Sequence, residues 1–233
     1  MIATIIVSLG LAGHVIQVYS IFYILPSAEV EYCIEDGEKS WVANITLLGL
    51  SIGAFLWGAL GGRIGRRRTL LSCLAVSGVF SVIAAFMPTY GPFMMARFCS
   101  AVGIGGAFPS GVCYLCEMTP LSCRSRVIAF LGTLTIASGI FAGATAISVI
   151  PLTGQMVVTE SKEHFSAWHR YLLLMTIVPI IGTILLCWLP ESPRYLLASG
   201  NEVEALSTYQ VGDSVLKPIS SINLYSFRRE SIE

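Results

Sequence analysis

The residues that could do chemistry in this chain fall into two groups, and the first lies where long apolar segments end. It consists of arginines, acids and glycines: Gly58, Gly62, Arg63, Gly65, Arg66, Arg67, Glu117, Arg124, Glu191 and Arg194. Opposite charges at helix ends pair with one another or with helix termini, and the strength of a pair depends on its solvation. At the ends of apolar segments, such residues anchor helix ends at a membrane surface or hold neighbouring helix ends together.

The second group lies inside apolar segments and consists of candidates for the lining of a cavity: His14, Gln17, Arg97, Gly103, Gly106 and Pro109. His14 and Gln17 are three residues apart and share a helix face. His14 either titrates near neutral pH and relays protons or packs as a hydrogen-bonded histidine. An arginine within hydrocarbon is costly, so Arg97 either faces a cavity, where it binds an anionic group or couples ions, or extends toward the membrane surface.

The sequence contains no pattern typical of an active site or a cofactor site. It has no nucleotide-binding loop, catalytic triad or cluster of metal ligands. Cys113 and Cys116 form a C-x-x-C pair, but within an apolar segment and without further ligands, which favours packing over a metal or redox site. We therefore expect no enzyme activity, no cofactor and no metal ion. The 14 basic and 14 acidic residues balance, which excludes nucleic acid as a partner.

The elements that must position these residues are predicted to be membrane-spanning helices. Of the 233 residues, 55% are hydrophobic and 12% are charged, too few charges for the surface of a soluble enzyme. Six apolar segments have the length of one bilayer crossing, at about residues 2–25, 41–60, 69–87, 92–115, 127–150 and 168–189. We expect the first to stop at Pro26. The predicted fold is all-α, with one six-helix bundle over residues 1–196 and a partly disordered tail over 197–233 that begins with a short helix at 202–209.

The placement of charges predicts how this bundle lies in the lipid bilayer. Basic residues follow the second, fourth and sixth apolar segments, whereas acidic residues follow the first and the fifth. Since basic loops remain in the cytosol, we expect the arginine-rich ends, the tail and both termini there. The predicted location is the plasma membrane or an intracellular vesicle membrane, which the chain crosses several times.

Three motifs resemble a known family of membrane proteins. Residues 58–68 (GALGGRIGRRR) resemble the G-x-x-x-D-R-x-G-R-R signature of the major facilitator superfamily. Residues 97–124, which begin RFCSAVGIGG and end EMTPLSCR, resemble the R-x-x-x-x-x-G-x-G-G…E-x-x-P-x-x-x-R pattern of its sugar-porter-like members. Residues 190–194 (PESPR) resemble the end of the sixth helix in the same proteins.

Shorter segments narrow the resemblance to the synaptic vesicle glycoprotein 2 family and its relatives. These are residues 25–29 (LPSAE), 53–58 (GAFLWG) and 102–106 (VGIGG), although related organic-ion transporters share part of this pattern. The resemblance implies secondary transport of a small organic solute or ion by alternating access. In that mechanism two six-helix halves rock around a site near the membrane midplane, and cytosolic charges lock one state. The resemblance therefore implies that the charged group at the segment ends forms a gate that opens to water; the alternative is that these residues only anchor helix ends at the membrane surface.

The chain departs from the family pattern in ways that leave a second function open. Gly62 replaces the acid of the first motif, and His14 and Gln17 stand where the first span of the synaptic vesicle family carries acids. The superfamily has about twelve spans and this chain has six, so we expect an incomplete product, a truncated isoform or a fragment. The alternative function is a non-transporting membrane or vesicle protein, or a half-transporter that acts through a second half or a full-length relative.

Overall fold

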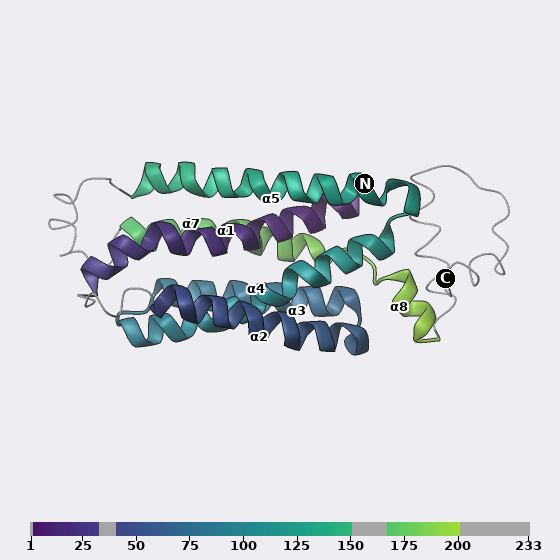
Figure 1. Cartoon of the computed structure of the whole chain (residues 1–233), viewed down its shortest axis with the longest axis horizontal. Coiled ribbons are helices and arrows are strands. Elements are labelled where there is room, and N and C mark those ends of the chain that lie inside the picture. The colour runs from purple at the N-terminus through teal and green to yellow at the C-terminus, as the bar shows by residue number, and fades with distance from the viewer. Residues whose placement is uncertain (1, 33–40, 151–166, 201–233) are drawn as a thin grey trace.

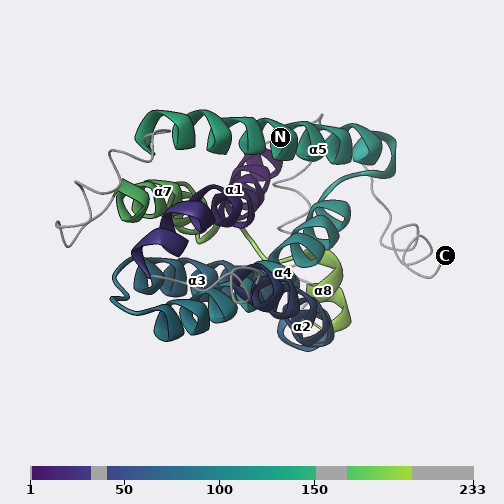
Figure 2. The same ribbon diagram turned by 60° about the vertical axis from the view of Figure 1, so that its left-hand side comes forward.

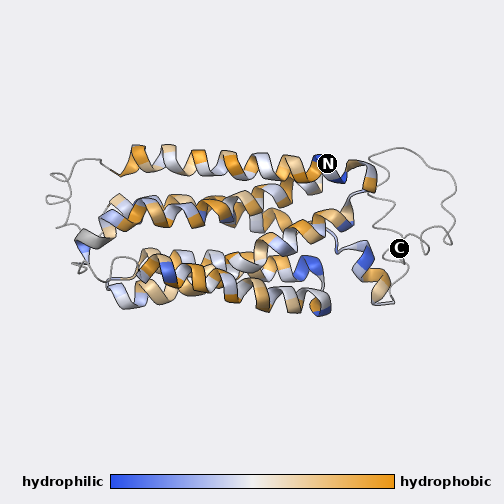
Figure 3. Cartoon of the chain, in the orientation of Figure 1, coloured by the Kyte–Doolittle hydropathy of each residue, from blue (hydrophilic) through white to orange (hydrophobic). Residues whose placement is uncertain are grey.

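The computed structural model describes residues 2–32, 41–150 and 167–200, and this part of the chain is mostly helical, without a strand. Its helices are α1 (Ile2–Glu31), α2 (Trp41–Ile64), α3 (Arg66–Ala85), α4 (Tyr90–Met118), α5 (Leu121–Val149), α7 (Ala167–Leu186) and α8 (Pro193–Ala198). All except α8 are long and apolar enough to cross a membrane. Hydrophobic residues lie along all six of these helices, as lipid requires (Figure 3).

Successive long helices run in opposite directions, so that their ends gather at two ends of the bundle (Figure 1). One end contains the starts of α1, α3 and α5, the ends of α2, α4 and α7, and the whole of α8. We call it the arginine end, because it contains Arg63, Arg66, Arg67, Arg68, Arg124 and Arg194.

The six long helices form two groups of three. In one group α4 packs against α2 and α3, and in the other α1 packs against α5 and α7 (Figures 1 and 2). The groups meet where α3 contacts α7 and where α1 contacts α4. Every long helix therefore has a neighbour on which it can bury one side, but α2 and α5 have the fewest buried residues: only 22% and 17% of their most apolar windows are buried, against 61% for α1.

Glycines let the helices of each group approach to backbone contact. A Cβ atom at Gly53 of α2 would collide with the carbonyl of Val102, and one at Gly103 of α4 would lie 2.7 Å from the Cys73 carbonyl oxygen of α3. In the other group, a Cβ at Gly13 of α1 would lie 2.8 Å from the backbone of α7. Such close contacts hold helices together where lipid removes the hydrophobic driving force.

The first helix does not stop at Pro26, as the sequence predicted, but continues to Glu31. Pro26 lacks the N–H that would bond to the Phe22 carbonyl. Its neighbours Ile24 and Ala28 are buried against other helices, being 1% and 2% exposed, and this packing holds the helix across the missing bond.

A single residue separates α2 from α3, where the sequence predicted a longer loop. α2 continues to Ile64, α3 begins at Arg66, and Gly65 between them has φ of 110°, a left-handed conformation that favours glycine. A Cβ at this position would also lie 3.0 Å from the Tyr195 ring and 3.1 Å from a Glu191 carboxylate oxygen. The arginines of the predicted loop are therefore helical residues beside other helix ends. The helix expected at 202–209 lies outside the described residues.

Candidate gating network and buried polar cluster

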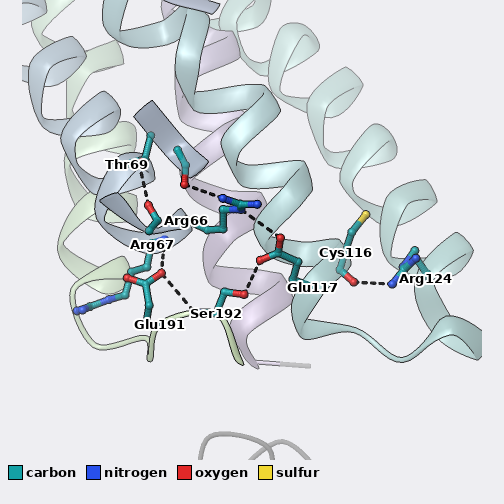
Figure 4. A network of polar contacts seen from close by, with 10 residues as sticks. Arg66, Arg67, Thr69, Cys116, Glu117, Arg124, Glu191 and Ser192 are labelled. Carbon is teal, nitrogen blue, oxygen red and sulfur yellow. Dashed lines mark hydrogen bonds and ion pairs between the residues drawn. The ribbon is translucent and has the colours of Figure 1, made fainter. Parts of the chain in front are cut away.

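Arg66, the first residue of α3, joins three helices at the arginine end (Figure 4). Its Nε donates to Glu117 Oε1 of α4 at 3.1 Å, and its Nη1 donates to the Gly61 carbonyl of α2 at 2.7 Å. Both side chains of the ion pair are partly buried, at 30% and 15% exposure. Burial strengthens this pair relative to a surface ion pair, because less water competes with it.

Glu191 and Ser192, which immediately precede α8, extend the network from α4 to α7. Ser192 donates its hydroxyl to the second oxygen of Glu117. Glu191 Oε1 accepts the backbone N–H groups of Arg67, at 2.7 Å, and of Ser192, at 3.2 Å. A carboxylate beside the first turn of α3 is favourable because helix N-termini carry free N–H groups and partial positive charge. Arg67 in turn donates from Nη2 to the carbonyl of Cys187, at 2.5 Å, just after α7.

Other bonds at this end involve helix termini. Arg124 Nη2 donates to the Cys116 carbonyl near the end of α4, at 2.8 Å (Figure 4). Tyr195 donates its hydroxyl to the Arg63 carbonyl, at 3.1 Å. These bonds satisfy carbonyl groups that a helix end leaves without partners. We call the contacts of Arg66, Arg67, Glu117, Arg124, Glu191, Ser192 and Tyr195 the gating network.

Several residues of the predicted gate contribute no side chain to it. Arg63 and Arg194 are exposed, and in the described part of the chain neither guanidinium forms an ion pair. Gly58 and Gly62 lie on the exposed side of α2, and a Cβ at Gly58 would meet nothing within 4 Å. A Cβ at Gly62 would lie 4.0 Å from Arg66 Nη1, so the acid of the superfamily motif would stand beside Arg66. Here Arg66 Nη1 donates to the Gly61 backbone carbonyl instead.

A second polar site, the buried polar cluster, lies between α1, α3, α4 and α7 and consists of His14, Gln17, Ser77, Ser81, Arg97, Ser100 and Thr176. His14 Nδ1 lies 3.1 Å from the Ser77 hydroxyl. Gln17 donates from Nε2 to the Thr176 hydroxyl at 3.0 Å and accepts the Ser81 hydroxyl on Oε1 at 3.1 Å. The Ser81 and Ser100 hydroxyls are 2.8 Å apart. These bonds join the two three-helix groups in the interior of the bundle.

Arg97 is turned into this cluster and does not extend to the membrane surface; it is 1% exposed. Its Nη2 donates to the Gln17 carbonyl at 3.0 Å, and its Nη1 lies 3.5 Å from Gln17 Oε1. Its Nε has no hydrogen-bond partner in the described residues. The acceptors around this guanidinium are neutral amide and carbonyl oxygens.

The expectation that Gly103 and Gly106 line a cavity with Arg97 is corrected by the structure, whereas the same expectation for Pro109 stays a prediction. Gly103 contacts the backbone of α3, and Gly106 leaves room for the Trp57 side chain of α2. Pro109 lies on the exposed surface of α4. The spacing of the glycines reflects close helix packing, because only a residue without a side chain fits at these contacts.

Sequence reasoning missed the hydroxyl groups of both sites, because serine and tyrosine at these positions belong to no charge pattern. At the start of α7, Trp168 is 2% exposed and packs on Tyr32 and Phe93, with ring centroids 5.8 and 5.6 Å away. Its Nε1 donates to Glu31 at 2.5 Å. Burial and the nearby Glu31 carboxylate raise the pKa of Tyr32, whose hydroxyl donates to the Met87 carbonyl at 2.9 Å. In the described residues, no group of three His, Cys, Asp or Glu could hold a metal ion.

Solved structures similar to this chain define the class of its fold. The proton:xylose symporter XylE, bound to 6-bromo-6-deoxy-D-glucose, matches with TM-score 0.79 and 19% identity, over 90% of this chain and 48% of XylE. The inward open xylose transporter XylE from E. coli matches with TM-score 0.72 and 17% identity, over 94% and 57% of the two chains. The protein therefore has the fold of the N-terminal half of a major facilitator protein.

The chain belongs to the sugar (and other) transporter family, whose model matches residues 1–224. Over 200 residues it is 32% identical to synaptic vesicle glycoprotein 2C of Rattus norvegicus and 34% identical to synaptic vesicle glycoprotein 2A of Homo sapiens. Each alignment covers 86% of this chain but only 28% and 27% of those proteins, so the chain spans less than a third of these relatives. A transporter family is not an enzyme class.

Proposed function

We propose that this chain forms the first half of a secondary transporter, which moves a small organic solute or ion across a lipid bilayer by alternating access. The observation that carries the proposal is the gating network, in which Arg66, Glu117 and Ser192 join α3, α4 and the start of α8. These contacts are only partly buried, and water that enters when this end opens would weaken them. They can therefore hold the arginine end closed in one state and release it in another.

In this proposal the arginine end faces the cytosol, and both termini lie there with the tail over residues 197–233. Residues 1–196 form the half-bundle. Glu191 and Arg67 would hold α3 to the end of α7, and Arg124 would hold α5 to α4. The buried polar cluster, with His14, Gln17 and Arg97, would lie beside the transport pathway, and the bond from His14 to Ser77 supports a packing role for this histidine over a proton relay.

Uptake into liposomes that contain the purified protein tests the proposal. The chain is reconstituted alone and together with a co-expressed C-terminal half of a full-length relative, and D-xylose, tetraethylammonium and benzoate represent neutral, cationic and anionic solutes. We expect uptake of at least one of them above that of empty liposomes, and about a tenfold loss in Glu117→Gln, because the Arg66 pair is broken. Uptake at the level of empty liposomes for all three solutes, from a folded preparation with both halves, contradicts the proposal.

A second function is favoured by the surface of α2 and α5: a non-transporting membrane or vesicle protein, or a half-transporter that binds a partner. These helices bury little within the chain and expose large apolar residues, among them Phe55 and Ile140 at 80% and 71%. Exposed apolar surface of this kind suits either lipid or another helical protein. Co-purification with a six-span or twelve-span partner, without uptake, would support this function.

A further inference from the structure

The interior of the bundle carries a positive charge that the described helices do not balance. The acidic residues of the membrane-spanning helices in the described part of the chain are Glu29 and Glu31 at the end of α1 and Glu117 at the end of α4. Arg97 is instead bound to Gln17, near the middle of the first span. An arginine keeps its charge in proteins, and a buried charge is costly without a counter-charge.

In the same region, some hydrogen-bond donors of the described residues have no acceptor. A guanidinium has five N–H donors, and within the described helices two bonds from Arg97 are found, one of them at the long distance of 3.5 Å. Arg97 Nε and His14 Nε2 are buried without a partner in the described residues. The Ser81 hydroxyl donates to Gln17 Oε1, and the Ser100 hydroxyl, 2.8 Å from that of Ser81, donates to the Ser77 carbonyl at 3.2 Å. Both hydroxyls can rotate toward a new acceptor that replaces these partners.

The neutral side chain of Gln17 occupies the position beside Arg97 where a negatively charged hydrogen-bond acceptor would be expected. Its Oε1 receives both the Ser81 hydroxyl and the long contact from Arg97. An amide oxygen in this position satisfies donors but leaves the charge of Arg97 in place. An anionic oxygen or a halide that displaced it would meet a guanidinium and a hydroxyl already directed at one point.

We propose that the buried polar cluster binds a singly charged anionic group, either the carboxylate of a solute or a small inorganic anion, against Arg97 and the hydroxyls of Ser81 and Ser100. Because Arg97 is 1% exposed, the anion enters when α1 and α4 move apart and the contact between Nη1 and Gln17 Oε1 breaks. The inference extends the proposed transport function, since it names the charge of the bound group. Anion binding is measured at equilibrium without a gradient, so the binding proposal can fail while the transport proposal stands, and the reverse.

The test measures thermal unfolding of the full chain in detergent micelles while an anion replaces a bulky sulfonate buffer at constant ionic strength. Chloride and acetate are the two probes. We expect one or both to raise the midpoint by about 3 °C with saturation, as a ligand of the folded state does. A response to chloride alone identifies an inorganic anion, and a response to acetate identifies a carboxylate.

Three variants relate the response to Arg97. Arg97→Gln should abolish it, whereas Arg126→Gln, which removes an exposed arginine of α5, should leave it unchanged. Gln17→Glu supplies an internal carboxylate, so it should fold with a raised midpoint and lose the response; it decides the matter if Arg97→Gln does not fold. A wild-type midpoint that neither anion changes, or a Gln17→Glu variant that responds like wild type, overturns the proposal.

Discussion

The gating network and the buried polar cluster both connect helices through arginine, but they do so with different partners. Arg66 binds a carboxylate, Glu117, and remains 30% exposed. Arg97 binds the amide and carbonyl oxygens of Gln17 and is 1% exposed. In the proposed function the first arrangement opens, because water can hydrate its charges when the pair separates and salt screens them.

Separating the helices at the buried polar cluster would require more free energy than opening the gating network. Exposing the partners of Arg97 to lipid would leave a charge and several hydroxyls without acceptors, which is expensive in hydrocarbon. The comparison therefore predicts that the cluster, as long as no anion replaces the Gln17 acceptor, fixes how the two three-helix groups pack, whereas the network adjusts one end. Substitutions of similar size in the two regions should separate these roles.

The largest effect is expected from Gln17→Leu, which keeps the volume of the side chain but removes its amide. Arg97 and Ser81 lose an acceptor and Thr176 loses a donor, so we expect about 3 kcal/mol of destabilisation. Thermal or denaturant unfolding in micelles measures it. Thr133→Leu is the matched control, because that exposed hydroxyl bonds only within its own helix, to the Ala129 carbonyl. A loss of less than 1 kcal/mol, equal to that of the control, would contradict a fixing role for the cluster.

A smaller and salt-dependent effect is expected from Glu117→Gln in the network. The amide keeps a hydrogen bond to Arg66 and to Ser192 but removes the ion pair, and partial exposure limits the loss to about 1 kcal/mol. A double-mutant cycle with Arg66→Gln isolates the coupling of the pair. The coupling should shrink on going from low salt to about 1 M salt, where screening is nearly complete. A coupling that salt leaves unchanged would mean that the pair behaves as a buried one and is unsuited to a gate.

The network was easier to predict from the sequence than the cluster. Charged residues at the ends of apolar segments mark helix ends by themselves, and the motif spacing grouped Arg66, Glu117 and Glu191 before any contact was known. The cluster depends on which faces of α1, α3, α4 and α7 meet, and one sequence does not determine that. Gly103 and Gly106 show the difficulty: a glycine on a span is equally compatible with a cavity and with a helix contact, and the structure has the contact.

Helix boundaries were predicted only approximately, for reasons of packing. Pro26 is a strong local signal for a helix end, but buried neighbours outweigh the one hydrogen bond it removes. Trp168, at the start of α7, contacts Tyr32, Phe93 and Glu31, which belong to other segments of the chain. Contacts between residues so distant in sequence are a property of the tertiary fold, so local patterns could not indicate them.

The smallest effect is expected from Gly62→Asp, which tests whether the network depends on the charge of Arg66. The new carboxylate would stand beside Arg66, since a Cβ at residue 62 lies 4.0 Å from Nη1, and Arg66 would exchange a carbonyl acceptor for a charged one. The unfavourable position of an acid near the end of α2 offsets part of this gain, so we expect stabilisation by about 0.5 kcal/mol, measured by unfolding in micelles. Gly58→Asp is the matched control, because a Cβ there meets nothing within 4 Å and should bring no gain. The gain at residue 62 should vanish in an Arg66→Gln background; if it persists there, or if Gly58→Asp stabilises equally, the network does not depend on the charge of Arg66.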